Sequence, residues 1–252
     1  MAKFKKPLLF ALSLLPIAII AGVFVIFYQI DIYSEEIISE IVAQFGSIDL
    51  LIAVSAVQAA AYAFVCAFFG YIFADKLGLI KPIKFEKRSL LITLAISAAG
   101  GIVLSLDHWV SGSMFDGIQQ ANAASLTAHG VIAAVIYGGV VEELMLRLFF
   151  MSLVALIVWK LFFRKYERDN IPEAVFVCAN IVAALLFAAG HLPATQTMFG
   201  ELTPLLLFRC FLLNGGFGLV FGWVYRKYGI HYAMAGHAMC HITSKLIWFI
   251  FI

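Results

Sequence analysis

The stretch from Glu142 to Arg147 combines residue types that can do acid-base chemistry. It places two adjacent acids, Glu142 and Glu143, and one base inside an apolar run from about 128 to 163. If this run crosses a lipid bilayer, each buried charge costs about 2.5 kcal/mol or more, so such residues mark function by default. We therefore expect this stretch to belong to a functional site.

Three histidines lie within or at the end of later apolar segments. His191 closes one such segment, and His237 and His241 lie inside the last one. His237 and His241 are four residues apart, which places both imidazoles on one helix face, the spacing of helical zinc ligands. The same spacing suits two groups that hydrogen-bond one substrate atom. We predict that these histidines meet the acid pair in a hydrolytic site. The alternative is that they are interfacial or hydrogen-bonded core histidines.

Helix geometry separates the roles of the two acids. Glu143 and Arg147 are four residues apart, so they share a face and can pair. Glu142 is rotated from Glu143 by about 100° and is left without that partner. We expect Glu142 to be the chemically active acid. The alternative is an ion-pair network of all three residues that only locks helices together.

The composition is that of a polytopic membrane protein. Of 252 residues, 63% are hydrophobic and only 13% are charged, against about 25% charged in an average soluble domain. We predict an all-α integral membrane protein of about seven transmembrane helices, with no separate soluble domain and no nucleic-acid partner. The four cysteines show neither disulfide nor metal spacing.

The apolar runs predict the membrane spans. Segment 107–127 is weakly polar and is expected to be re-entrant or interfacial, and it would give an eighth span if it enters the membrane. The predicted spans are 7–28, 50–74, 89–106, 128–163, 174–190, 204–225 and a last one that reaches residue 252.

Lysine and arginine alternate between the connecting loops. They occur at the N-terminus and after the second, fourth and sixth spans, and the other loops have almost none. The positive-inside rule then predicts a cytoplasmic N-terminus and a C-terminus on the far side.

Other polar residues within spans are expected to support packing or the site. Arg209 and Asn214 lie in the sixth span, and Lys245 lies near the chain end, where it is expected to snorkel to an interface. Counted from the basic loops at about 1.5 Å per residue, His191 and His237 would differ in depth by about 15 Å. We therefore expect a tilted helix or a bend at Gly190 and Pro193.

Three motifs together resemble those of the CPBP family, which includes type II CAAX prenyl endopeptidases and bacteriocin-processing or self-immunity (ABI) proteins. They are Glu-Glu-x-x-x-Arg at 142–147, Phe-x-x-x-His at 187–191 and His-x-x-x-His at 237–241. The resemblance implies a catalytic core within 128–252, preceded by N-terminal transmembrane helices and a connecting segment at 1–127.

The resemblance implies an intramembrane endopeptidase. Glu142 and His191 would activate the attacking water, and His237 with residue 241 would stabilise the oxyanion. Glu143, Arg147 and Phe187 would support the site, and Asn214 is an expected neighbour. The substrate would be a peptide precursor or a prenylated protein at the bilayer.

His241 departs from the family pattern, which has Asn or Asp at this position. A histidine still donates a hydrogen bond to an oxyanion, so glutamate-activated water without a cofactor is the preferred mechanism. The alternative is a zinc site formed by His191, His237 and His241 with Glu142, in which the metal generates the nucleophile.

Two other functions compete with the endopeptidase. A proton-coupled carrier would relay protons through buried Glu and His side chains, and it predicts an internal repeat that the sequence does not show. A non-catalytic bacteriocin-immunity or binding protein would keep the fold and would tolerate Glu142→Gln.

Overall fold

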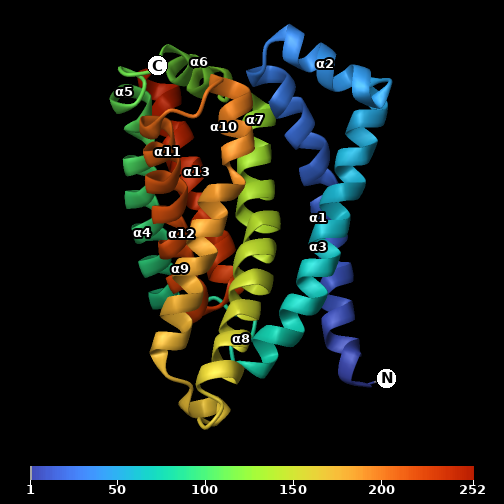
Figure 1. Cartoon of the computed structure of the whole chain (residues 1–252), viewed down its shortest axis with the longest axis vertical. Helices are drawn as coiled ribbons and strands as arrows, with labels where there is room; N and C mark the ends of the chain where they lie inside the picture. Colours follow the sequence, from blue (N-terminus) through green and yellow to red (C-terminus); the bar gives the residue numbers. More distant parts are fainter. Residues whose placement is uncertain (1) are drawn as a thin grey trace.

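In the computed structural model, which describes residues 2–252, all regular elements are helices, and they form an elongated bundle (Figure 1). The predicted all-α membrane fold is confirmed. The long segments are α1 (Ala2–Ile32), α3 (Ile48–Lys76), α4 (Lys87–Ser105), a continuous run from α7 (Ala128–Ile132) to α8 (Ser152–Phe162), α9 (Glu173–Gly190), a run from α11 (Pro204–Cys210) to α12 (Gly216–Tyr228), and α13 (Ile230–Phe251).

Within the described residues, six helical segments are long and apolar enough to cross a membrane. The seventh predicted span, α13, contains 22 residues, which gives it a length of about 33 Å at about 1.5 Å per residue. Its histidines and Lys245 make it less apolar than the others, but it packs against α4 and η1 inside the bundle. The structure is therefore consistent with seven spans.

Short helices cover one end of the bundle. They are α2 (Glu35–Phe45), α5 (Asp107–Val110), α6 (Asp116–Ala124) and α10 (Leu192–Phe199) (Figure 1). The weakly polar segment 107–127 thus forms surface helices at this end and adds no further span. At the opposite end lie the start of α1, the α3–α4 connection and the α8–α9 connection, which contains the short η3 (Arg168–Asn170).

Polar caps fix where several helices begin. The hydroxyl groups of Ser34, Ser47, Thr127 and Thr203 each accept a hydrogen bond from a backbone N–H in the first turn of α2, α3, α7 and α11. Such caps satisfy backbone donors that the helix itself leaves free. Thr127 therefore defines the start of the helix that carries the acid pair.

That helix is wound unusually widely. Segments η1 (Ala133–Glu142) and η2 (Leu144–Met151) have π-helical hydrogen bonds, as does the short η4 (Phe211–Gly215). In a π-helix the N–H donates to the carbonyl five residues back, and such turns occur frequently at functional sites.

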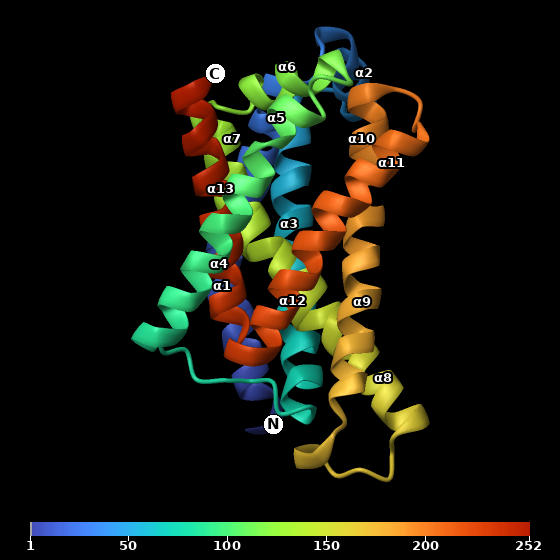
Figure 2. The same cartoon turned by 90° about the vertical axis from the view of Figure 1, so that its left-hand side faces the viewer.

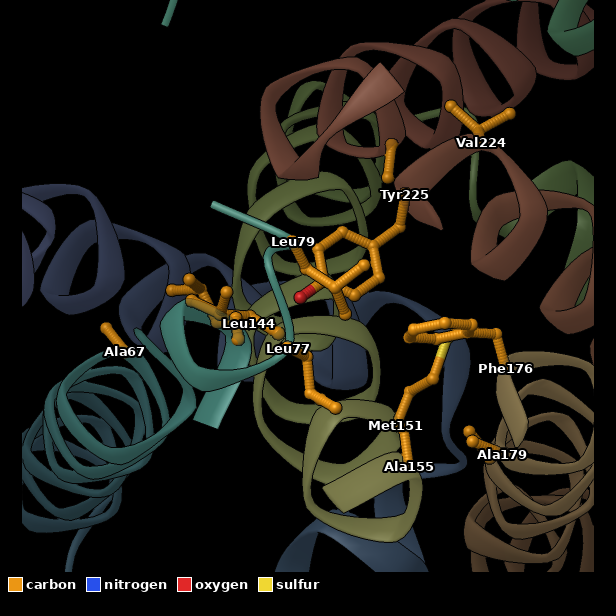
Figure 3. Close-up of a cluster of buried hydrophobic side chains, with 14 of the residues drawn as sticks. Ala67, Leu77, Leu79, Leu144, Met151, Ala155, Phe176, Ala179, Val224 and Tyr225 are labelled. Atoms are coloured by element: carbon orange, nitrogen blue, oxygen red, sulfur yellow. The ribbon is translucent and has the colours of Figure 1, made fainter. Parts of the chain in front are cut away.

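A buried hydrophobic cluster joins α3, η2, α8, α9 and α12 (Figure 3). Leu144, Met151, Phe176 and Tyr225 are almost fully buried in it. The Tyr225 hydroxyl is satisfied within the cluster by a 2.8 Å hydrogen bond to Ser152 Oγ. This cluster is a tightly packed part of the bundle, between the acid pair and the end with the α8–α9 connection.

The structure also explains how His191 and His237 reach the same depth despite their different distances from the basic loops. The junction of α12 and α13 lies closer to the middle of the bundle than the α8–α9 connection does (Figure 2), so α13 starts deeper than α9. The predicted break after Gly190 is present: α9 ends there, and α10 begins at Leu192 with Pro193 in its first turn.

Candidate active site

One cavity of about 590 Å³ contains all four predicted catalytic side chains. Glu142 from η1, His191 from the end of α9, and His237 and His241 from α13 all line its wall. The structure therefore brings together residues that are up to about a hundred positions apart in the sequence. Phe187 and Asn214, predicted as supporting residues, line the same cavity. The other two, Glu143 and Arg147, lie behind its wall.

Glu142 of η1 faces this cavity together with residues of the preceding turns. Tyr137 and Gly138, five and four residues before Glu142, also line the cavity. Glu142 is half-buried, so its carboxylate faces the cavity without being sealed off.

Glu143 is fully buried and contacts two nitrogen-bearing side chains. Its Oε2 lies 3.4 Å from Arg147 Nε, which confirms the predicted pair. Its Oε1 lies 2.9 Å from His237 Nδ1. The sequence analysis missed this second partner, since nothing in the spacing shows which ring nitrogen of His237 faces the acid helix. Glu143 therefore neutralises Arg147 and fixes His237 at the same time.

Arg147 is 2% exposed and is enclosed by aromatic rings. Its guanidinium carbon lies 4.7 Å from the centre of the Phe187 ring and 5.9 Å from that of Phe221, distances at which the ring faces attract a cation. Nη2 also donates to the Gly218 carbonyl at 3.4 Å. Phe187 thus ties the α9 motif to the acid helix.

Hydrogen bonding fixes the orientation of two imidazoles. A carboxylate or carbonyl oxygen only accepts, so His237 Nδ1–H donates to Glu143, and His191 Nδ1–H donates to the Phe187 carbonyl at 2.8 Å. In the neutral rings, Nε2 is then the atom with a free lone pair. In a protonated ring, Nε2 becomes a hydrogen-bond donor.

His237 and His241 present their Nε2 atoms to the same place. The rings stack with centroids 5.0 Å apart. A Cβ atom built on Gly138 would meet His241 Nε2 at 3.1 Å and His237 Nε2 at 3.6 Å. The absent side chain at Gly138 thus leaves room for both nitrogens beside the acid helix.

The zinc alternative can be compared with this geometry. Metal-bound histidines commonly donate their second ring nitrogen to a carboxylate or carbonyl, and His191 and His237 both do so. However, among the described residues no group of three or more His, Cys, Asp or Glu side chains is arranged to hold a metal ion. The four residues of the zinc alternative line one cavity without forming such a group, and zinc dependence stays a prediction.

The outer part of the cavity carries the basic side chains of Arg209 and Lys245. Arg209 Nε donates to Asp107 Oδ1 at 2.8 Å, and its Nη2 contacts the other carboxylate oxygen. Lys245 is 7% exposed and donates to the Ser125 carbonyl at 2.8 Å, so the prediction that it snorkels to an interface is wrong. Burial raises the pKa of the Tyr33 hydroxyl, which lines the cavity.

Comparison with known proteins supports the motif-based resemblance. Residues 124–243 match the family model described as Type II CAAX prenyl endopeptidase Rce1-like. No curated protein and no solved structure matches the chain. The matched segment includes the three motifs and begins just before α7, so the family signal covers the helices that form the inner wall of the cavity.

Proposed function

We propose that the chain is an intramembrane endopeptidase that uses glutamate-activated water, on the premise that residues 124–243 match the model of the Rce1-like type II CAAX prenyl endopeptidases. The observation that carries the proposal is the common cavity of Glu142, His191, His237 and His241. Four groups capable of proton transfer or oxyanion binding face one space within a membrane-spanning bundle.

Glu142 is the proposed general base. It faces the cavity with no ion-pair partner among the described residues, whereas Glu143 is occupied by Arg147 and His237. A free carboxylate can accept a proton from water as the oxygen attacks a carbonyl carbon. His191, with Nδ1–H held by the Phe187 carbonyl, presents Nε2 as a second acceptor for the same water.

His237 and His241 are the proposed oxyanion partners. Protonated at Nε2, His237 can donate to a developing oxyanion, and the resulting imidazolium is stabilised by Glu143 at 2.9 Å. Donors fixed before the reaction are typically worth about 2.7–4 kcal/mol of transition-state stabilisation each. The stacked ring of His241 aims a second nitrogen at the same region.

The proposed substrate is a membrane-associated polypeptide. The family description favours a prenylated CAAX-type C-terminus, and a peptide precursor without a lipid is the alternative. Both would reach a cavity that lies between membrane-spanning helices. The two are distinguished by comparing cleavage of a farnesylated peptide with cleavage of the same peptide without the lipid.

Glu142→Gln tests the proposal. The purified protein in proteoliposomes is given an internally quenched peptide in farnesylated and unmodified form. Hydrolysis by the native protein that is lost with Glu142→Gln supports the proposal, because the amide cannot accept the proton. Glu167→Gln, at an exposed position in the α8–α9 connection, is the matched control and should hydrolyse normally.

The outcomes also separate the competing functions. If Glu142→Gln keeps full activity, the catalytic role is wrong. If neither protein hydrolyses any peptide while Glu142→Gln keeps the protein's cellular phenotype, a non-catalytic immunity or binding role is favoured.

Zinc dependence is tested on the same preparation. The metal content and the activity are measured for the native protein and for His241→Asn, which restores the family residue. We expect activity without bound zinc in both. Stoichiometric zinc that is lost together with activity on chelation would replace the metal-free mechanism with a zinc-dependent one.

A further inference from the structure

Charge is divided between the two ends of the bundle. One end carries the start of α1 and the α3–α4, α8–α9 and α12–α13 connections, and the other carries α2, α6 and α10 (Figure 1). The basic end contains Lys5, Lys6, Lys76, Lys81, Lys84, Lys87, Arg88, Arg164, Lys165, Arg168, Arg226 and Lys227, and the acidic end contains Asp31, Glu35, Glu36, Glu40, Asp49, Asp107 and Glu201. Some acids also lie at the basic end, but no loop at the acidic end contains Lys or Arg.

The cavity extends from the catalytic residues toward the acidic end. Its outer wall is formed by Tyr33 after α1, Asn122 of α6, and Thr195 and Phe199 of α10. None of the residues in the basic loops lines it. The space that contains Glu142 is therefore continuous with the end of the bundle where the short helices lie.

The surroundings of the helix that carries the acid pair change at Glu142, from cavity to packed core. It runs from the acidic end at Ala128 to the basic end at Phe162 (Figure 1). The residues on its cavity face, from Gly130 to Glu142, come first. Leu144, Leu148 and Met151 follow and are at most 1% exposed.

Close packing then fills the bundle on the basic side of the site. Leu144, Met151, Phe176 and Tyr225 converge in one cluster with Leu77 and Leu79 of the basic α3–α4 connection (Figure 3). Interiors packed in this way leave few voids as large as a water molecule. Water and substrate therefore approach Glu142 from the acidic end.

Membrane proteins orient their basic loops toward the cytoplasm. The basic end identified above is then cytoplasmic, and the end at which the cavity opens lies on the other side of the membrane. We propose that the active-site cavity opens to the exocytoplasmic face and takes a polypeptide presented from that side, such as an exported peptide or the outer segment of a membrane protein. This inference rests on the proposed endopeptidase function and specifies the source of its substrate. It favours the peptide without a lipid over the prenylated C-terminus that the family description alone favours.

Cysteine labelling tests the orientation of the cavity independently of activity. In a background where Cys66, Cys178, Cys210 and Cys240 are replaced by alanine, single substitutions Asn122→Cys in the cavity, Glu201→Cys at the acidic end and Glu167→Cys at the basic end are exposed to a membrane-impermeant maleimide on intact cells. The first two should be labelled from outside, and Glu167→Cys only after permeabilisation. The reverse pattern would overturn the proposal. If Glu201→Cys is labelled but Asn122→Cys is not labelled even in detergent, the cavity is closed at the acidic end, and this result would also overturn the proposal.

Hydrolysis by sealed vesicles tests the side from which substrate enters. Right-side-out and inside-out vesicles that contain the native protein receive the charged, quenched peptide that detergent-solubilised native protein cleaves and Glu142→Gln does not. Cleavage by right-side-out vesicles at least about tenfold faster is expected, since a charged peptide does not cross the bilayer. Faster cleavage by inside-out vesicles would refute the exocytoplasmic entry and leave the endopeptidase intact. If solubilised protein cleaves no peptide, the endopeptidase function itself fails, and the labelling still decides the orientation of the cavity.

Discussion

The buried ion pair of Glu143 and Arg147 provides a quantitative test of how the site is supported. The two side chains are 0% and 2% exposed, and their closest charged atoms are 3.4 Å apart. Glu143→Gln leaves a buried guanidinium without its acid, and Arg147→Met leaves a buried carboxylate with only His237. Removing one partner of a buried pair costs about 3–5 kcal/mol, whereas removing both leaves no uncompensated charge. The double variant should therefore lose about 1–3 kcal/mol less than the sum of the single losses.

The free energy of unfolding of all four proteins is measured by reversible denaturation in mixed micelles. The control is the pair of Arg226 and Glu173, whose nitrogen and oxygen are 2.9 Å apart but whose side chains are 33% and 68% exposed. The corresponding cycle on this pair should give a coupling below about 1 kcal/mol, because water screens it. If the buried pair shows additive losses, or no more coupling than the exposed pair, the inference that Glu143 and Arg147 neutralise each other is refuted.

Three further predictions concern the cavity wall. Gly138→Ala places a methyl group 3.1 Å from His241 Nε2 and should lower peptide hydrolysis by about tenfold or more. The control is Gly216→Ala, whose methyl group meets nothing within 4 Å and which should hydrolyse normally. Equal hydrolysis by the two variants would contradict the placement of the His241 imidazole. Lys245→Met removes the donor to the Ser125 carbonyl and should lower the stability of this contact by about 1–3 kcal/mol. The segment near α6 should then be cleaved faster in limited proteolysis. An unchanged cleavage rate would contradict the idea that Lys245 anchors this segment. A peptide with lysines remote from its cleavage site should have a lower KM than its glutamate counterpart, because exposed acids such as Glu35, Glu36 and Glu40 lie at the end where the cavity opens. The difference should shrink with salt, and equal KM values at low salt would argue against entry there.

The sequence predicted those features that depend on local periodicity. The apolar runs located the spans to within a few residues, and the four-residue spacing predicted the contact between Glu143 and Arg147. The same spacing put His237 and His241 on one face, where their rings stack. These features follow from helix geometry, which is the same wherever a helix is placed in the bundle.

Features that depend on tertiary packing were not predictable in this way. The π-helical winding of the helix that carries Glu142 has no signal in residue spacing. Lys245 resembles a snorkelling residue by position, but Ser125, the residue that follows α6, supplies an acceptor for it. The pairing of Arg209 with Asp107 joins segments about a hundred residues apart; an isolated arginine in an apolar run does require an acid partner, but the sequence does not say which one.

The measurement that tests the proposed mechanism most directly is the rate of peptide hydrolysis by Glu142→Gln under single-turnover conditions, with correct folding confirmed by unchanged thermal unfolding. Loss of the general base predicts a rate about 10²–10⁴-fold below that of the native protein, while Glu167→Gln matches the native rate. A Glu142→Gln rate within about twofold of native, which is far smaller than the loss of a general base causes, would contradict the assignment of Glu142 as the residue that activates water.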